Sequence, residues 1–119
     1  MPINYELGSA SLSTKSKSII DNHILTKLNA DPSAVVEVGS HTDSRGSSEL
    51  NQSLSERRSK TVVEYLNQKG IKTSRLIAVG YGESKLLNDC EDGKDCAENK
   101  HAKNRRTEFK FFQLTQSNC

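Results

Sequence analysis

Aromatic side chains are scarce in this chain, which has no tryptophan, three tyrosines and three phenylalanines among 119 residues. So few rings leave little surface for stacking on nucleobases. The formal net charge of +2 is also too small to attract a polyanion. No apolar run approaches the ~20 residues of a membrane-spanning helix, and no basic segment followed by an apolar one marks a signal peptide. These absences argue against nucleic-acid binding and against a membrane span within this sequence.

The hydrophobic share of 33% is low, but the apolar residues follow regular patterns. The length, together with the lack of a repeat or linker, predicts a single domain over residues 1–119, with a flexible tail over residues 113–119. Met1 and Pro2 lead directly into a strand-like segment. We therefore expect the domain to be an excerpt of a longer exported protein, whose signal and anchor lie outside this sequence.

One stretch, residues 35–65, organises the chain. It opens with a β-branched run that ends at Gly39, which predicts a buried strand. Residues 40–48 are polar or glycine, as expected of a loop. From about Ser48 to about Lys69 the pattern is that of an amphipathic helix. Its apolar stripe consists of Leu50, Leu54, Val62 and Leu66.

The segments outside this stretch alternate between strands and helices. Residues 1–8 and 75–79 predict strands, and residues 11–30 predict a helix. Residues 107–112 predict the last strand, at a sheet edge or beside the first strand, after a long polar excursion over residues 86–103. The order predicts an α/β sandwich, in which one mixed sheet is covered on one face by two long helices.

One cation interrupts the apolar stripe of the second helix. Arg58 lies four residues after Leu54 and four before Val62, so it falls on the apolar line. A buried guanidinium needs a partner, and Asp43 in the preceding loop is the nearest acid. Two interpretations stay open: an internal salt bridge that ties the loop to the helix, or an acid and a base that together receive a ligand with an ammonium and a carboxylate.

Four short motifs occur in order along the chain. They are T-D-x-x-G at residues 42–46, N-x-x-L-S-x-x-R at residues 51–58, G-Y-G-E at residues 80–83 and N-R-R at residues 104–106. With these motifs the chain closely resembles, over nearly its whole length, the OmpA-like peptidoglycan-binding domain family of the OmpA C-terminal, peptidoglycan-associated lipoprotein and MotB type. Two departures are visible, because Ser40 stands where many members have glycine and Ser59 where most have alanine.

The resemblance implies a βαβαβ core plus a final strand, and it implies a function. Members of this family bind peptidoglycan non-covalently through the meso-diaminopimelate of its stem peptide, which tethers the outer membrane to the wall. We therefore expect a periplasmic domain of an outer-membrane-associated protein, with peptidoglycan and possible other envelope proteins as partners and with no cofactor.

The resemblance also assigns roles to residues. Asp43 is expected to accept from the ligand ammonium and Arg58 to clasp the carboxylate. The helix after Gly46 adds free N–H groups near that carboxylate. Asn51 either bonds the peptide or braces the loop. The remaining candidates for ligand contact at this mouth are Thr42, for which turn bonding is the simpler role, and Leu54.

Arg105 and Arg106 follow from the last motif. The resemblance places both beside the pocket, and Asn104 is expected to lock the adjoining loop. Adjacent residues entering a strand face opposite ways, so one arginine is expected to meet the ligand and the other a surface acid. The sequence does not say which. Arg45 and Arg57 are expected to be solvated surface charges.

Cys90 and Cys96 flank five polar residues, which close easily into a disulfide loop in an oxidising compartment. The alternative is a metal site that adds His101, but the spacing fits no standard zinc pattern, so we expect no metal. The C-x5-C insertion resembles a Bacteroidetes-like subgroup of the family. Cys119 receives no role.

Catalysis is the weakest interpretation. His41, Asp43 and Ser44 suggest a triad, but triad members normally come from distant segments, and no nucleophile elbow is present. A paired-carboxylate site of Asp43 with Glu56 fails because Glu56 is expected to face solvent. We therefore predict that the domain is not an enzyme. Two functions remain: the peptidoglycan-binding module, or an envelope protein-interaction domain in which the Asp43–Arg58 pair is purely structural.

Overall fold

The computed structural model describes residues 2–88, 90 and 96–113, so the predicted tail lies almost wholly outside the described residues. The elements follow one another as β1 (Ile3–Asn4), α1 (Thr14–Ile19), the π-helical segment η1 (Ile20–Leu25), α2 (Thr26–Ala30), β2 (Ala34–Ser40), α3 (Ser48–Gln68), the 3-10 segment η2 (Thr73–Arg75), β3 (Leu76–Gly80), α4 (Glu98–Ala102) and β4 (Arg106–Gln113). No helix of the described part is long and apolar enough to cross a bilayer.

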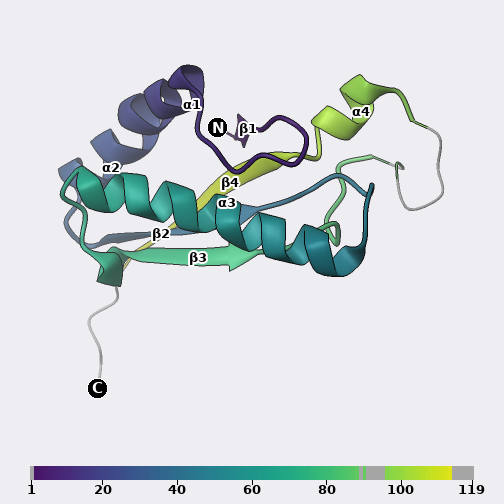
Figure 1. Cartoon of the computed structure of the whole chain (residues 1–119). Helices are drawn as coiled ribbons and strands as arrows, with labels where there is room; N and C mark the ends of the chain where they lie inside the picture. Colours follow the sequence, from purple (N-terminus) through teal and green to yellow (C-terminus); the bar gives the residue numbers. More distant parts are fainter. Residues whose placement is uncertain (1, 89, 91–95, 114–119) are drawn as a thin grey trace.

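The four strands form one mixed sheet in the order β1-β4-β2-β3. β2 and β3 run parallel, as a strand–helix–strand crossover requires, and β4 is antiparallel to both of its neighbours. The helices α1–α2 and α3 lie on one face of this sheet (Figure 1). The predicted sandwich is therefore confirmed. The last strand lies beside the first, as one of the two alternatives had it, and not at an edge.

The first helix is continuous from Thr14 to Ala30, but it contains a π-helical turn that the sequence did not predict. Ser13 caps its start by accepting from the Ser16 amide. Just after the π segment, Thr26 Oγ1 donates to the carbonyl of Asp21, five residues back, at 3.0 Å. This helix contributes Ile20, Ile24 and Leu28 to the core.

The α3 helix begins and ends as predicted. The Ser47 side chain accepts from the Leu50 amide, and Gly70 adopts φ +99° just beyond the last turn, where a side chain would be strained. Of the four residues in the expected apolar stripe, only the last two, Val62 and Leu66, are fully buried. Val62 and Leu66 have no exposed surface, whereas Leu50 is 70% exposed. The first turns of α3 extend past the end of β3 (Figure 1), so this part of the helix does not pack on that strand.

The two departures from the family pattern meet in the core. Ser59 Oγ on α3 lies 2.7 Å from Ser40 Oγ on β2 and donates to the Val38 carbonyl at 2.9 Å. Ser40 Oγ in turn lies 2.6 Å from Thr107 Oγ1, which lies 2.7 Å from the Tyr5 hydroxyl. Buried hydroxyls need such partners. The two serines therefore compensate each other and link α3 to three strands or their flanks.

This hydroxyl chain gives a prediction about stability. Replacing Ser59 or Ser40 by alanine leaves the other hydroxyl one partner short, so each single variant should unfold about 1 kcal/mol more easily. The double variant should lose less than the sum, with a coupling of at least ~0.5 kcal/mol. Urea unfolding measures all three. Ser53→Ala is the control, since Ser53 is exposed on the same helix, and additive losses at the two core positions would contradict the coupling.

Candidate ligand-binding site

A pocket of about 270 Å³ opens where the loop after β2 meets the first turns of α3, the Leu7–Gly8 turn and Arg105. It gathers most of the residues predicted to bind ligand, namely Thr42, Asp43, Gly46, Asn51, Leu54, Arg58 and Arg105. Leu7, Gly8, Arg45, Leu50 and Arg57 complete its lining. Segments from both ends of the chain therefore meet at one site.

Arg58 is the most deeply buried of these side chains, with no exposed surface. Its Nε donates to the carbonyl of Ser9 at 2.7 Å, Nη1 to that of His41 at 2.8 Å and Nη2 to that of Glu6 at 3.2 Å. The guanidinium also lies over the Tyr5 ring, 4.6 Å from its centroid. Burial lowers the pKa of Arg58 to about 10, which leaves it charged at neutral pH. Arg58 thus joins the turn before the first helix to the end of β2.

The internal salt bridge between Arg58 and Asp43, one of the two interpretations left open for this pair, does not form, because Asp43 pairs with Arg45 and Arg105. Both side chains line the pocket, but the cation is held by main-chain carbonyls. A guanidinium presents five N–H donors, and three well-placed carbonyl oxygens satisfy a buried one without a carboxylate. Such acceptors exist at every residue, so the sequence contains no signal that distinguishes them.

Asp43 pairs with two other arginines. Its Oδ2 accepts from Arg45 Nη2 at 2.8 Å and from Arg105 Nη1 at 3.1 Å, and its Oδ1 accepts from the Arg45 amide at 3.0 Å. Asp43 is 2% exposed. Burial alone would raise its pKa, but the hydrogen bonds from Arg45 and Arg105 outweigh burial and hold the pKa below the usual range. Asp43 is therefore ionised at neutral pH.

Arg45 and Glu98 belong to the site although sequence reasoning missed them. Arg45, expected to be a solvated charge, also contacts Glu98 Oε1 at 3.0 Å, and Arg105 Nη2 donates to Glu98 Oε2 at 2.7 Å. Asp43, Arg45, Glu98 and Arg105 thus form a closed ring of alternating charges. Glu98 opens the short helix α4 inside the segment expected to be irregular, so no pattern pointed to it.

The two adjacent arginines separate as strand geometry predicts. Arg105 lines the pocket, whereas Arg106 does not and instead pairs with Glu108 through Nε and Oε2 at 2.9 Å. Arg106 Nη2 also donates to the Lys85 carbonyl at 3.0 Å. Arg106, which was also a ligand-binding candidate, therefore does not line this pocket, and both arginines pair with an exposed acid, Arg105 with Glu98 and Arg106 with Glu108.

The loop that presents Asp43 is braced from three sides. Asn51 Nδ2 donates to the carbonyls of Asp43 at 3.3 Å and Arg45 at 3.1 Å, and to Glu83 Oε1 at 3.0 Å. Thr42 Oγ1 donates to the Asp43 carbonyl at 2.9 Å. Asn51 and Thr42 therefore support the loop, which was one of the two roles left open for each of them.

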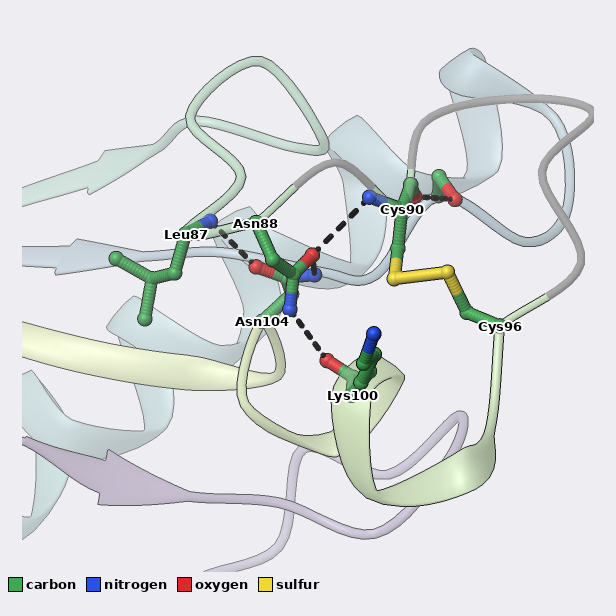
Figure 2. Close-up of a disulfide and its surroundings, with 7 residues drawn as sticks. Leu87, Asn88, Cys90, Cys96, Lys100 and Asn104 are labelled. Atoms are coloured by element: carbon green, nitrogen blue, oxygen red, sulfur yellow. Dashed lines mark hydrogen bonds between the residues drawn. A yellow bond between two sulfur atoms is a disulfide. The ribbon is translucent and has the colours of Figure 1, made fainter.

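Cys90 and Cys96 form the expected disulfide (Figure 2). The alternative metal site with His101 is therefore excluded, since both sulfurs are already bonded to each other. The first residue of this disulfide loop also contacts the loop between β2 and α3, because Ser44 Oγ donates to the Cys90 carbonyl. Cys119 lies outside the described residues.

Asn104 locks the neighbouring loop, as expected. Its Oδ1 accepts from the Leu87 amide at 2.7 Å and its Nδ2 donates to Asn88 Oδ1 at 3.0 Å (Figure 2). Asn88 Nδ2 in turn donates to the carbonyl of Lys100 in α4 at 2.9 Å. The first residue of the N-R-R motif thus fixes the backbone from which Arg105 extends.

His41 packs under the loop and does not line the pocket. Its ring stacks on Tyr81 with centroids 5.0 Å apart, and Nε2 lies 3.5 Å from Glu108 Oε1. Burial, and next the charge of Arg106, lowers the pKa of His41 to about 4, so the ring is neutral at pH 7. Asp43 faces arginines and Ser44 faces Cys90, so these three side chains do not assemble a triad.

Comparison with known proteins shows the family to which the chain belongs. The sequence model of the OmpA family matches residues 4–100, which is most of the chain. The chain belongs to the OmpA family. It is 42% identical over 89 residues to the peptidoglycan-associated lipoprotein of Legionella pneumophila, covering 75% of this chain and 47% of that protein. The chain thus spans half or less of the length of curated relatives such as this one.

Solved structures of OmpA-like domains share the fold. The peptidoglycan-associated lipoprotein from Burkholderia pseudomallei superposes with a TM-score of 0.82 at 25% identity, covering 93% of this chain and 89% of that chain. The C-terminal domain of Helicobacter pylori MotB gives a TM-score of 0.80 at 21% identity, covering 99% and 87%. The sheet order and the helical layer described above are thus those of an OmpA-like domain.

The buried position of Arg58 predicts a structural role in this OmpA-family domain. Replacing Arg58 by methionine leaves three carbonyl oxygens without their donor, so unfolding in urea should become easier by about 3 kcal/mol or more. Arg57→Met is the matched control: Arg57 is exposed on the same turn, and its loss should change stability by no more than ~0.5 kcal/mol. Equal effects of the two variants would contradict this role.

The neutral state of His41 predicts a loss of stability in mild acid. The folded pKa of about 4 lies below the ordinary 6.5, so the unfolded chain binds the proton first and stability falls as pH drops through this interval. The full loss is on the order of 3 kcal/mol. Urea unfolding between about pH 7 and about pH 5 measures most of it.

His41→Phe is the test variant, because phenylalanine keeps a ring against Tyr81 and cannot titrate. Its stability should stay flatter over the same interval, while the other two histidines remain as an internal control. Parallel pH profiles for the variant and the wild type would show that another group causes the loss.

Proposed function

We propose that this domain binds peptidoglycan non-covalently through the meso-diaminopimelate of its stem peptide. The observation that supports this most directly is that one pocket of a domain of the OmpA family contains the buried acid Asp43 together with the arginines 58 and 105. The free end of a diaminopimelate side chain bears an ammonium and a carboxylate on one carbon. The pocket thus offers each charge of that ligand an opposite charge within a small volume.

Binding in this proposal is an exchange of partners. The ligand ammonium replaces Arg45 at Asp43, since Arg45 has a side chain that is 38% exposed and is free to swing toward solvent. The ligand carboxylate is received on the arginine side of the pocket. Arg105 offers its Nη groups, and three hydrogen bonds leave Arg58 two of its five N–H groups. Gly46 and Leu50 place the start of α3 at the same wall, so its positive end favours the carboxylate.

The cellular role follows from this ligand. A disulfide persists in the periplasm and not in a reducing cytosol, so we place the domain in the periplasm. Relatives of the chain include proteins named peptidoglycan-associated lipoprotein and outer membrane protein A. We infer that the domain belongs to an outer-membrane-associated protein, acts without catalysis and tethers that membrane to the wall.

A second candidate is an envelope protein-interaction domain of the same fold. Asp43 and Arg58 are 2% and 0% exposed, and both already have internal partners. Leu7 and Leu50, which line the pocket mouth, are 61% and 70% exposed. Exposed apolar side chains beside occupied charges suit a protein partner, and the binding experiment separates the two functions.

Calorimetric titration with a diaminopimelate-containing muropeptide tests the proposal. A muropeptide with lysine in the same place is the ligand control, because it has the ammonium and lacks the carboxylate. Wild type should bind only the first. Asp43→Asn and Arg105→Gln should each weaken binding by about ten- to a hundredfold, which is the range for losing one charge-assisted hydrogen bond.

Arg106→Gln is the matched protein control. It removes an arginine that is equally buried and adjacent in sequence, but that does not line the pocket. Its affinity should stay close to that of the wild type, with folding of every variant checked by circular dichroism. If folded wild type fails to bind, the peptidoglycan proposal is wrong and the protein-interaction function takes its place. If wild type binds but Arg106→Gln weakens binding as much as Arg105→Gln, the assignment of the ligand to this pocket is wrong.

A further inference from the structure

Glu98 pairs with Arg105, the arginine that is proposed to receive the ligand carboxylate, and also with Arg45. Its two carboxylate oxygens contact Arg45 Nη2 at 3.0 Å and Arg105 Nη2 at 2.7 Å. The hydrogen bond from Arg105 is the largest cause that lowers the pKa of Glu98, which keeps the carboxylate charged at neutral pH. The Glu98 side chain is 61% exposed, whereas that of Arg105 is 6% exposed. An exposed acid therefore covers a buried cation at the edge of the pocket.

The insertion holds Glu98 in this position. Cys96 precedes Glu98 by two residues and is bonded to Cys90, whose carbonyl accepts from Ser44 beside Asp43. Cys90 is thus hydrogen-bonded to the loop after β2. Just after Cys96, Glu98 pairs with Arg45 and Arg105. Lys100, two residues beyond Glu98, accepts through its carbonyl from Asn88.

We propose that Glu98 is a specificity-determining residue, an internal carboxylate that a ligand must displace from Arg105 and that favours zwitterionic ligands over simple anions. This inference rests on the proposed function. A ligand with only a carboxylate exchanges one carboxylate for another on Arg105 and gains nothing at Asp43. A ligand with an ammonium as well gains Asp43, from which it displaces Arg45, while Arg45 and Glu98 remain available to each other.

The charge balance gives the direction of the effect. Removing the Glu98 charge leaves Arg45 and Arg105 with one acid, Asp43, between them. The pocket then becomes more positive, which favours a monoanion and does less for a ligand whose ammonium is repelled by the same field. The Glu98→Gln variant should therefore bind carboxylates more tightly and distinguish zwitterions less well.

The main comparison tests two probes on three proteins, and two disulfide-free variants extend it. The probes are the diaminopimelate muropeptide and the same muropeptide with its free side-chain amine acetylated, which keeps the carboxylate and removes the ammonium. The proteins are wild type, Glu98→Gln and Glu64→Gln. Glu64 is exposed on α3 and does not line the pocket, so its variant changes net charge equally without touching Arg105.

In wild type the free-amine probe should bind more tightly. In Glu98→Gln the acetylated probe should gain about two- to fivefold in affinity, the range for releasing exposed ion pairs, and the ratio between the probes should fall. Glu64→Gln should leave that ratio unchanged. The Cys90→Ser/Cys96→Ser variant should shift the ratio in the same direction, because loss of the disulfide weakens the hold of Glu98 on Arg105. In the Glu98→Gln background it should add little, because that carboxylate is already absent.

The outcomes separate this inference from the proposed function. Binding of the free-amine probe by wild type, with an unchanged ratio or weaker binding of both probes in Glu98→Gln, would overturn the role of Glu98 alone. In that case Glu98 merely orients Arg105. A failure of all folded proteins to bind either probe would overturn the proposed function, and the role of Glu98 with it.

Discussion

The buried guanidinium of Arg58 is the interaction on which the site depends. Its three carbonyl partners belong to Glu6, Ser9 and His41, so one side chain of α3 joins a turn near the start of the chain to the loop that follows β2. Residues next to these partners, namely Leu7, Gly8 and Thr42, line the pocket. A charge this deeply buried is tolerated because every bonded nitrogen has an acceptor. The hydrogen bonds of Arg58 therefore hold together the segments that line the pocket.

The charges around this cation are already paired before any ligand arrives. Asp43 is shared by Arg45 and Arg105, and Glu98 occupies the same two arginines. A ligand that enters such a ring must break existing ion pairs to form its own. The free energy of binding is therefore the difference between the ion pairs formed and the ion pairs broken, which are similar in strength. Selectivity then depends on whether the newcomer replaces both an acid and a base at once, which an amino acid terminus does and a simple ion does not.

The parts of the fold that sequence predicted are those with local causes. The β-branched run of β2, the helix that ends before Gly70 and the close disulfide each depend on neighbours in sequence. The need of Arg58 for a partner was also predictable, but the partner was not, because main-chain carbonyls are the same at every residue. Glu98 reaches Arg45 across more than fifty residues, a pairing that no period or short motif encodes.

The family motifs and the rest of the chain therefore control different properties of the site. The motifs supply Asp43, Arg58 and Arg105, which line one pocket and to which we assign the recognition of the ligand. Glu98 lies outside the motifs, two residues after the disulfide-closed insertion, and pairs with Arg45 and Arg105. If the proposed exchange is right, two OmpA-family domains with identical motifs can differ in affinity and selectivity, since an exposed carboxylate paired with a buried arginine lowers the free energy of the ligand-free state and not that of the complex.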